Sequence, residues 1–211
     1  YVMNEQQWKK LTNRLKGKNI TKTVLLIACF SEILSLWSKK ACFTLNLTIF
    51  NRFNFHPQIN DIVGDFTTIS LLEVNNKDTK SIELKARKIQ EQLWNDLDNG
   101  LYSGIRVTEQ LLRKGYISEP FPVVFTSLLD LNYSEKDDFQ DIFKVVNQEE
   151  TSKNSISQTP QVWLDHQVIE KGGELYFNWD VVEELFPQGM IDEMFDAYCK
   201  LLHLLAESDE A

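Results

Sequence analysis

A long apolar segment followed at once by a strict alternation of apolar and polar residues constrains this fold most. The segment Ile20 to Lys40, ITKTVLLIACFSEILSLWSKK, has apolar residues at helical spacing, a polar start and a lysine-rich end. It predicts a buried helix that begins after Thr21. The next residues, CFTLNLTIFNR, alternate with the period of a strand that has one strongly apolar face.

The rest of the chain continues this mixture of helices and strands. Ser81 is placed to cap a helix that ends at Asn99 and Gly100, and SGIRVTEQLLRKG predicts a shorter helix closed by Gly115. FPVVFTSLL reads as an apolar strand, and PQVWLDHQVIEKGGELYFNWD as two strands joined by a Gly172–Gly173 turn. Residues 147–158 are the best loop candidate, and a final helix carries Met190 to Leu205. We therefore expect a single α/β lobe, with helices packed on a mixed sheet.

Composition excludes several classes of function. The net charge of -9 over 211 residues would repel a phosphate backbone, and no nucleic-acid-binding motif offsets it. The longest apolar run, VLLIACF, is too short to span a bilayer. Three cysteines without metal-ligand spacing, Cys29, Cys42 and Cys199, predict thiols in a reducing compartment, with Cys29 and Cys199 buried. We expect a cytoplasmic protein with no metal, no nucleic acid and no membrane partner.

One local charge pattern departs from the acidic average. Six basic residues and no acid occur between Lys9 and Lys22, namely Lys9, Lys10, Arg14, Lys16, Lys18 and Lys22. This basic run is either a solvated helix face or a docking surface for an acidic partner.

An acid in an apolar strand is the most unusual feature of the motif SQTPQVWLDHQ. On a strand through Val162 to Val168, Asp165 shares one face with Trp163, Gln161 and Gln167. An apolar neighbour raises the pKa of a carboxyl group and amide donors lower it, so this setting suits an acid that transfers protons. An exposed Asp on an edge strand fits the spacing equally well.

Hydroxyl and acidic side chains in two other segments are further candidates. In PVVFTS, Thr126 shares one strand face with Val124, while Ser127 lies on the other face; such hydroxyls often only bond a neighbouring carbonyl. In VGDFTT, Asp65 follows Gly64 in a predicted turn. The catalytic signatures of hydrolases, zinc proteases and nucleotide-binding enzymes are absent from the sequence.

Four motifs in order carry a resemblance: LTIFNRFNFHPQINDIVGDFT, PVVFTSLL, SQTPQVWLDHQ and FNWD. Together they resemble the C-terminal motifs of heterocyclization domains of nonribosomal peptide synthetases, which belong to the condensation-domain superfamily. The similarity extends over essentially the whole chain, including LWNDLDNGLYSGIRV and LFPQGMIDEMF.

The resemblance implies a chloramphenicol-acetyltransferase-like lobe, one of two that form a V around a tunnel. Donor and acceptor peptidyl carrier proteins would insert phosphopantetheine arms into this tunnel, and no cofactor would be bound directly. Domains of this family join an acyl group to carrier-bound cysteine, serine or threonine. They then cyclise and dehydrate the product to a thiazoline or oxazoline.

The resemblance also assigns roles to residues. It makes Asp165 and Thr126 the residues tied to cyclodehydration, and we take Ser127, Gln161 and Asp65 as supporting residues. The family's D-x-x-x-x-D motif belongs to an N-terminal lobe that this sequence does not show, so the chain is expected to be the C-terminal lobe and to be inactive alone. Asn54 and Thr68 stand where the family often has proline and serine.

Two other functions stay open on the sequence. The chain could be a noncatalytic lobe on which carrier proteins dock, as the basic run suggests, or part of a condensation domain that forms an amide and stops. The FTS and PQVWLD motifs argue against the second. Which amino acid is cyclised does not follow from the sequence.

Overall fold

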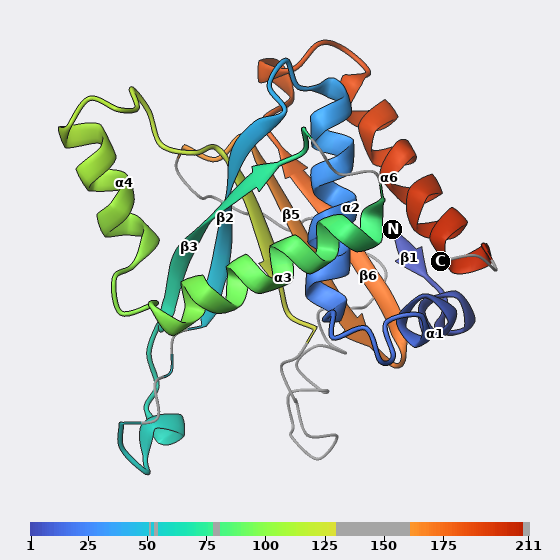
Figure 1. Ribbon diagram of the computed structural model, residues 1–211, viewed down its shortest axis with the longest axis horizontal. Helices are drawn as coiled ribbons and strands as arrows, with labels where there is room; N and C mark the ends of the chain where they lie inside the picture. The colour runs from blue at the N-terminus through green and yellow to red at the C-terminus, as the bar shows by residue number, and fades with distance from the viewer. Residues whose placement is uncertain (51, 53–54, 78–80, 130–160, 209–211) are drawn as a thin grey trace, which may run out of the picture.

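A mixed β-sheet forms the centre of the structure (Figure 1). The computed structural model describes residues 1–50, 52, 55–77, 81–129 and 161–208. Within these residues the sheet has six strands in the order β1-β6-β5-β4-β2-β3. The strands are β1 (Val2–Met3), β2 (Cys42–Phe50), β3 (Thr67–Asn75), β4 (Val123–Ser127), β5 (Leu164–Lys171) and β6 (Glu174–Val181). Strand β4 runs parallel to β2 and β5, and the other neighbours are antiparallel.

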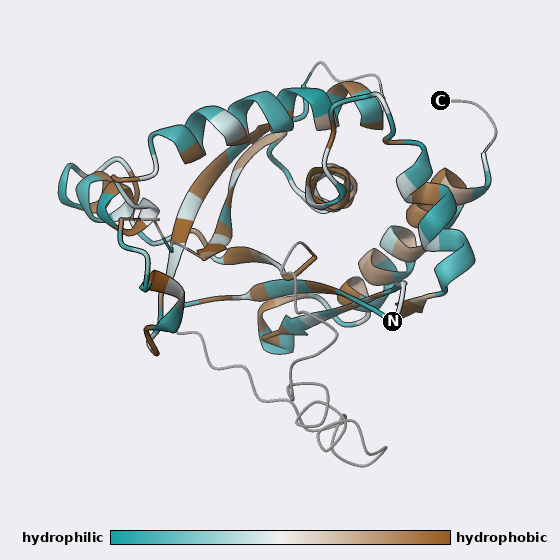
Figure 2. Ribbon diagram, turned by 90° about the horizontal axis from the view of Figure 1, so that it is seen from below, coloured by the Kyte–Doolittle hydropathy of each residue, from teal (hydrophilic) through white to brown (hydrophobic). Residues whose placement is uncertain are grey.

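Helices cover one face of this sheet. Among the described residues the α-helices are α1 (Glu5–Asn13), α2 (Lys22–Trp37), α3 (Ile82–Asp98), α4 (Gly104–Arg113) and α6 (Met190–Glu207), with short 3-10 turns at Ile59–Asp61 and Glu183–Leu185. Figure 2 shows α2 end-on, with the sheet on one side, α3 opposite and α6 beside it. The predicted α/β architecture with a mixed sheet is therefore confirmed.

Helix α2 is the centre of the packing because it is apolar around most of its circumference. Its buried side chains run without a break from Val24 to Ser31, and Ile33 is also buried. A helix that is apolar on all sides must be surrounded by other elements. The Thr21 hydroxyl accepts a hydrogen bond from the backbone N–H of Val24, so the predicted cap starts this helix.

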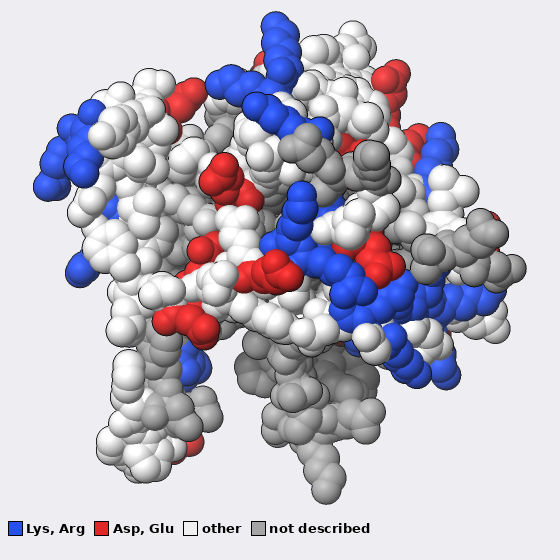
Figure 3. Space-filling view, in the orientation of Figure 1, with Lys and Arg blue, Asp and Glu red and all other residues white. Residues whose placement is uncertain are grey.

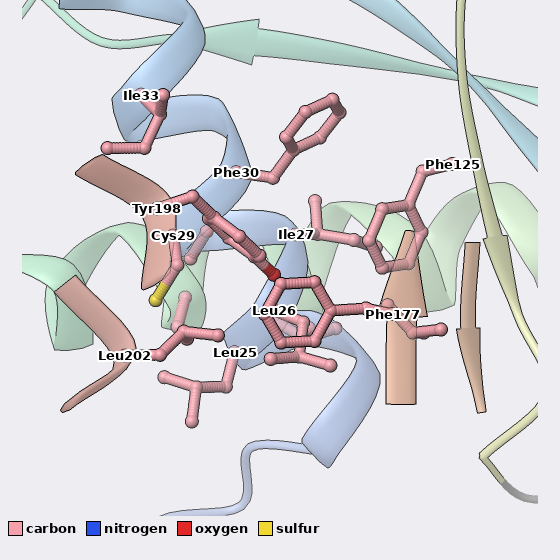
Figure 4. Close-up of a cluster of buried hydrophobic side chains, with 14 of the residues drawn as sticks. Leu25, Leu26, Ile27, Cys29, Phe30, Ile33, Phe125, Phe177, Tyr198 and Leu202 are labelled. Atoms are coloured by element: carbon pink, nitrogen blue, oxygen red, sulfur yellow. The ribbon is translucent and has the colours of Figure 1, made fainter. Parts of the chain in front are cut away.

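The core lies between α2, the sheet and α6 (Figure 4). Phe30 of α2 contacts Phe125 of β4 and Tyr198 of α6, with ring centroids 6.1 and 6.3 Å apart. Phe177 of β6 packs against Tyr198 at 5.3 Å. Cys29 and Cys199 are buried as predicted, and Cys42 is half-buried.

Several local predictions are confirmed. The Ser81 side chain caps α3, Gly115 follows α4 with a positive φ of 71°, and the hairpin turn has φ values of 59° at Gly172 and 83° at Gly173. Two positive φ angles in a two-residue loop match the twist of the strands on either side. This turn fixes the register between β5 and β6.

Other predictions differ from the structure. Strand β5 begins at Leu164, not at Val162, because Gln161 turns the chain with a φ of 69°. Strand β3 and helix α1 were not predicted from the sequence. The loop assigned to residues 147–158 and the substitution at Asn54 lie outside the described residues. Among the helices that the structure describes, none has the length and apolar character needed to cross a bilayer.

Candidate functional site

Asp165 and Thr126 meet on the sheet face that points away from α2. Parallel pairing places Val124 beside Asp165 and Thr126 beside Gln167 on neighbouring strands β4 and β5. Because side chains alternate along a strand, Thr126, Asp165 and Gln167 all point to the same face. The Thr126 Oγ1 donates a hydrogen bond to Asp165 Oδ1 across 3.3 Å.

A row of polar contacts extends from this pair to both sides. On β2, Thr48 Oγ1 lies 2.9 Å from Thr126 Oγ1. The Thr126 hydroxyl has one proton, which it gives to Asp165, so Thr48 is the donor in this contact. On the other side, Gln167 Nε2 donates to Asp165 Oδ2 at 2.8 Å and to Asp180 Oδ2 of β6 at 3.3 Å.

The Asp165 carboxyl group has an altered affinity for protons. Its side chain is buried, with 8% of the residue exposed. Burial raises the pKa of Asp165 because the charged form loses hydration, and the negative charge of Asp180 adds to this. The hydrogen bonds from Gln167 and Thr126 oppose the rise in pKa without cancelling it. The site therefore holds a carboxyl group that releases its proton less readily than an ordinary aspartate.

The structure does not bring the three supporting candidates to Asp165. Ser127 points to the helix side of the sheet, where its Oγ lies 2.9 Å from the Oγ1 of Thr23. The side chain of Thr67 and, to a smaller extent, its backbone N–H hydrogen-bond to Asp65, and they lower the pKa of this exposed carboxyl group. Gln161 is exposed in the turn before β5.

The position of Trp163 also differs from the prediction. The sequence pattern placed Trp163 beside Asp165 within a strand, whereas the residue is 38% exposed and precedes the strand. Its backbone N–H donates to the carbonyl of Pro122, and its carbonyl accepts from Val182. Trp163 thus anchors the start of β5, and the amide that reaches Asp165 is that of Gln167.

His166 occupies the opposite face from Asp165 and is fully buried, with 0% exposure. Its Nε2 lies 3.0 Å from the hydroxyl of Tyr198, and its Nδ1 lies 3.4 Å from the carbonyl of Asn178. A carbonyl can only accept, so Nδ1 carries the proton and Nε2 accepts from Tyr198. Burial lowers the pKa of His166 to about 3, so this ring is a neutral part of the core.

Asp180 and Thr48 were missed by the sequence reasoning, although a signal for Asp180 was present. Counting seven residues back from Gly172 and seven on from Gly173 gives Asp165 and Asp180, which are register partners. A two-residue hairpin loop fixes the register of its strands, so the pairing follows from the turn. Thr48 depended on the order of β2 and β4 in the sheet, which no local pattern gives.

The basic run is distributed over α1, the following loop and the start of α2, and blue side chains gather there in Figure 3. Within the part of the chain that the structure describes, Lys18 and Lys22 form ion pairs with acidic side chains. Lys18 Nζ lies 2.7 Å from Glu83, and Lys22 Nζ lies 2.6 Å from Glu170. Lys10 and Lys16 are exposed. The positive surface is thus smaller than the sequence suggests.

A metal centre is not formed by the parts of the chain that the structure describes. No three histidine, cysteine, aspartate or glutamate side chains gather there in an arrangement that could hold an ion.

Comparison with known proteins identifies the family. The sequence profile described as Condensation domain matches residues 2–210. The chain belongs to the condensation domain family. The resemblance to the condensation-domain superfamily that the sequence motifs carried is thereby confirmed.

The similar proteins include synthetases and a cyclization domain. The chain is 37% identical over 210 residues to pyochelin synthetase PchF of Pseudomonas aeruginosa, covering 99% of this chain and 11% of PchF. It is 38% identical over 200 residues to phenyloxazoline synthase MbtB of Mycobacterium tuberculosis, covering 94% of this chain and 14% of MbtB.

Among solved structures, the EpoB NRPS cyclization-docking bidomain of Sorangium cellulosum matches with a TM-score of 0.80 and 36% identity. The match covers 99% of this chain and 41% of that chain. The predicted lobe fold is confirmed by this similarity. The chain spans a small part of the length of the curated relatives and less than half of the bidomain.

Proposed function

We propose that this chain is part of a heterocyclization domain of a nonribosomal peptide synthetase. The domain would condense an acyl or peptidyl thioester with carrier-bound cysteine, serine or threonine and cyclodehydrate the product to a thiazoline or oxazoline. The observation that carries the proposal is the contact between Thr126 and Asp165, a hydroxyl and a buried carboxyl group on one sheet face. Similarity to a phenyloxazoline synthase and to a cyclization domain supports it.

The chemistry requires protons to move twice after the amide has formed. First, the amine of the acceptor attacks the donor thioester, and the donor phosphopantetheine thiol leaves. The acceptor's side-chain thiol or hydroxyl then attacks the new amide carbon and loses its proton, while the carbonyl oxygen gains one and becomes a hydroxyl. Finally the carbon–oxygen bond of this hydroxyl breaks, the amide nitrogen loses its proton, and one water is released as the C=N bond forms.

Asp165 is suited to both proton transfers. As a carboxylate it would take the proton of the attacking thiol or hydroxyl and deliver it to the carbonyl oxygen. It would next take the amide proton and deliver it to the leaving hydroxyl. A pKa raised by burial favours this exchange, because a proton acceptor works best when its pKa lies near the working pH.

Thr126 would position the carboxyl group of Asp165. Its hydroxyl donates to Asp165 Oδ1 and thereby fixes the orientation of the carboxyl plane. The second contact, from Thr48, fixes the direction of the Thr126 hydroxyl in turn. When a catalytic group is already held in a productive geometry, less entropy is lost on reaching the transition state, and the barrier is lower.

The partners belong to the same proposal. This chain would be the C-terminal lobe, and an N-terminal lobe of the same domain would form the other wall of the tunnel. Donor and acceptor carrier proteins would present their substrates there on phosphopantetheine arms. The isolated chain is then expected to be inactive, because one wall cannot align two thioesters.

The test is Asp165→Asn in the complete two-lobe domain, with both loaded carriers present. This substitution keeps the shape of the side chain and removes the titrating group. We expect the open amide to form and accumulate, heavier than the ring product by one water in intact-mass analysis of the carrier. Ring formation at the unsubstituted rate would contradict the assignment, and loss of amide formation would indicate a role in the tunnel or the fold. A condensation domain that only forms amides would release no ring product even without the substitution.

A further inference from the structure

Two carboxylates face each other across β5 and β6, which is an unfavourable arrangement for a sheet. Asp165 and Asp180 are direct register partners, and like charges placed opposite each other destabilise a strand pair. The fold nevertheless places them on the same face, one buried and one half-buried. Such a pair needs either a compensating donor or a functional reason.

Gln167 supplies the compensating donor. Its Nε2 lies 2.8 Å from Asp165 Oδ2 and 3.3 Å from Asp180 Oδ2. An amide nitrogen has two N–H groups, so one can be given to each carboxylate. The opposite orientation of the amide would turn its oxygen toward two acceptors. The orientation that points the nitrogen at both acids is therefore the favourable one when both are charged.

The two acids differ in their surroundings. Asp180 is half-exposed and receives a second donor, because Asn178 Nδ2 lies 3.2 Å from its Oδ1. Asp165 is buried and receives donors from Thr126 and Gln167. Different environments around two neighbouring carboxylates can give the two groups different roles.

We propose that Asp180 and Gln167 are positioning residues for Asp165. Gln167 donates a hydrogen bond to Oδ2 of Asp165 and leaves Oδ1 beside Thr126. Asp180, the register partner of Asp165, places a negative charge next to it. This inference rests on the proposed function, because it concerns the same proton transfer. It adds two residues to the site that act through Asp165 and do not themselves exchange protons with the substrate.

The charged groups around Asp165 can be named strand by strand. Within the described residues, Asp180 from β6 is the charged neighbour that acts on it. From β4 it meets Val124 and Thr126, which do not titrate, and Thr48 of β2 lies one contact further away. The effect of Asp180 on Asp165 is therefore open to a direct test by substitution.

The two positioning residues have opposite effects on the proton affinity of Asp165. The negative charge of Asp180 raises the pKa of Asp165, whereas the hydrogen bond from Gln167 lowers it. Asp180→Asn should consequently make Asp165 ionise at lower pH, and Gln167→Met should make it ionise at higher pH. If the two residues had only a structural role, their substitutions would not shift the ionisation of Asp165 in opposite directions.

The experiment measures the cyclisation rate against pH in the complete domain for Asp180→Asn, Gln167→Met and Tyr176→Phe. Tyr176 lies on β6 and its hydroxyl contacts Glu174 at the hairpin, so Tyr176→Phe is a matched control. We expect the midpoint of the rising limb to move down for Asp180→Asn, up for Gln167→Met, and not at all for the control. The maximal rate should fall roughly tenfold for Gln167→Met, since the carboxyl group loses a fixed orientation.

A second measurement separates this inference from the proposed function. The carboxyl carbon of Asp165 can be titrated by NMR in the 211-residue chain, with Asp165→Asn used to assign its signal. Opposite shifts of its midpoint in the two variants are the expected result, and identical midpoints in all proteins would overturn the inference. If Gln167→Met fails to fold, the midpoint measured in Asp180→Asn tests the inference by itself: a lower midpoint supports it and an unchanged midpoint overturns it. Cyclisation unaffected by Asp165→Asn, together with shifted midpoints, would reject the proposed function while the coupling of the two acids stands.

Discussion

Thr126 and Asp165 are 39 positions apart in the sequence, and parallel pairing of β4 with β5 brings the Thr126 Oγ1 to 3.3 Å from the Asp165 Oδ1. The contact lies on the sheet face opposite α2, whereas Phe125 and His166, their neighbours in sequence, point into the core. Each strand therefore contributes one side chain to the core and the next to the candidate site. The fold and the site depend on the same pairing.

Removing the Thr126 hydroxyl should slow cyclisation less than removing the Asp165 carboxyl group. Loss of a general acid or base typically lowers a rate by about 10² to 10⁴. Thr126→Val keeps the β-branched shape and the carboxyl group, so we expect a loss of roughly tenfold with amide formation unchanged. Thr48→Val, which leaves the Thr126–Asp165 contact in place, should have a smaller effect. Equal losses for Thr126→Val and Asp165→Asn would contradict a positioning role.

The buried acid should make stability depend on pH in a defined direction. Burial raises the pKa of Asp165 above its ordinary value of 3.8. Between pH 3.8 and the raised pKa of the folded state, the folded chain keeps a proton that the unfolded chain has released. Raising the pH through this window therefore lowers the contribution of Asp165 to stability. Asp165→Asn removes this dependence. In urea unfolding, the variant should gain stability relative to the unsubstituted chain as the pH rises from below 3.8 to 7, and a constant difference would show that the group is not perturbed.

His166 should make the fold sensitive to acid. Its pKa falls from 6.5 to about 3 in the folded state, so below pH 6.5 the unfolded chain binds a proton that the folded chain does not. Stability contributed by the neutral ring is complete above pH 6.5 and is lost toward pH 3, at up to about 1.4 kcal/mol per pH unit.

The matched variant for this prediction is His166→Phe, which suits the surrounding aromatic rings. It should cost about 1–3 kcal/mol at neutral pH, because the Tyr198 hydroxyl loses its partner. Between pH 6.5 and 4 its stability should fall less steeply than that of the unsubstituted chain. Parallel urea-unfolding curves over this range would show that His166 does not carry the acid sensitivity.

Charge reversal on the basic run should weaken binding of an acidic carrier protein, if this surface docks one. Because Lys18 and Lys22 are paired with Glu83 and Glu170, the informative change is Lys10→Glu with Lys16→Glu. We expect weaker binding and a flatter dependence on salt. The control Lys39→Glu with Lys40→Glu changes the net charge equally, at two exposed residues that follow the C-terminal end of α2. If both pairs weaken binding to the same extent, the basic run is only a solvated surface.

Helices α2 and α3 and the β5–β6 hairpin could be predicted from the sequence because their patterns are local, whereas β3, which is as long as β2, was missed. Thr21 and Ser81 cap helices whose apolar residues recur at helical spacing, and the two glycines of the hairpin define its turn. Helix α1 was missed because its buried residues are only Trp8 and Leu11, too few for a clear period. Strand β1 has two residues, and only its pairing with β6 makes it a strand.

The candidate site could be predicted from the sequence only in part. Alternation along each strand predicted the faces of Thr126 and Asp165, but their contact depends on β4 and β5 being neighbours, which is a property of the whole sheet. Ser127 was grouped with them because it is adjacent in sequence, yet adjacency in a strand places it on the opposite face. Gln161 was assigned to the strand because its positive φ leaves no signature in the residue type.

The most direct test of the central claim, that Asp165 acts after the amide has formed, supplies the open amide itself. A carrier loaded with the uncyclised acyl-cysteine, acyl-serine or acyl-threonine is mixed with the complete domain, and loss of one water is followed by intact mass in a single turnover. The account predicts that the unsubstituted domain converts the open amide to the ring and that Asp165→Asn is slower by about 10² to 10⁴. Conversion of the open amide by Asp165→Asn at the unsubstituted rate would contradict it.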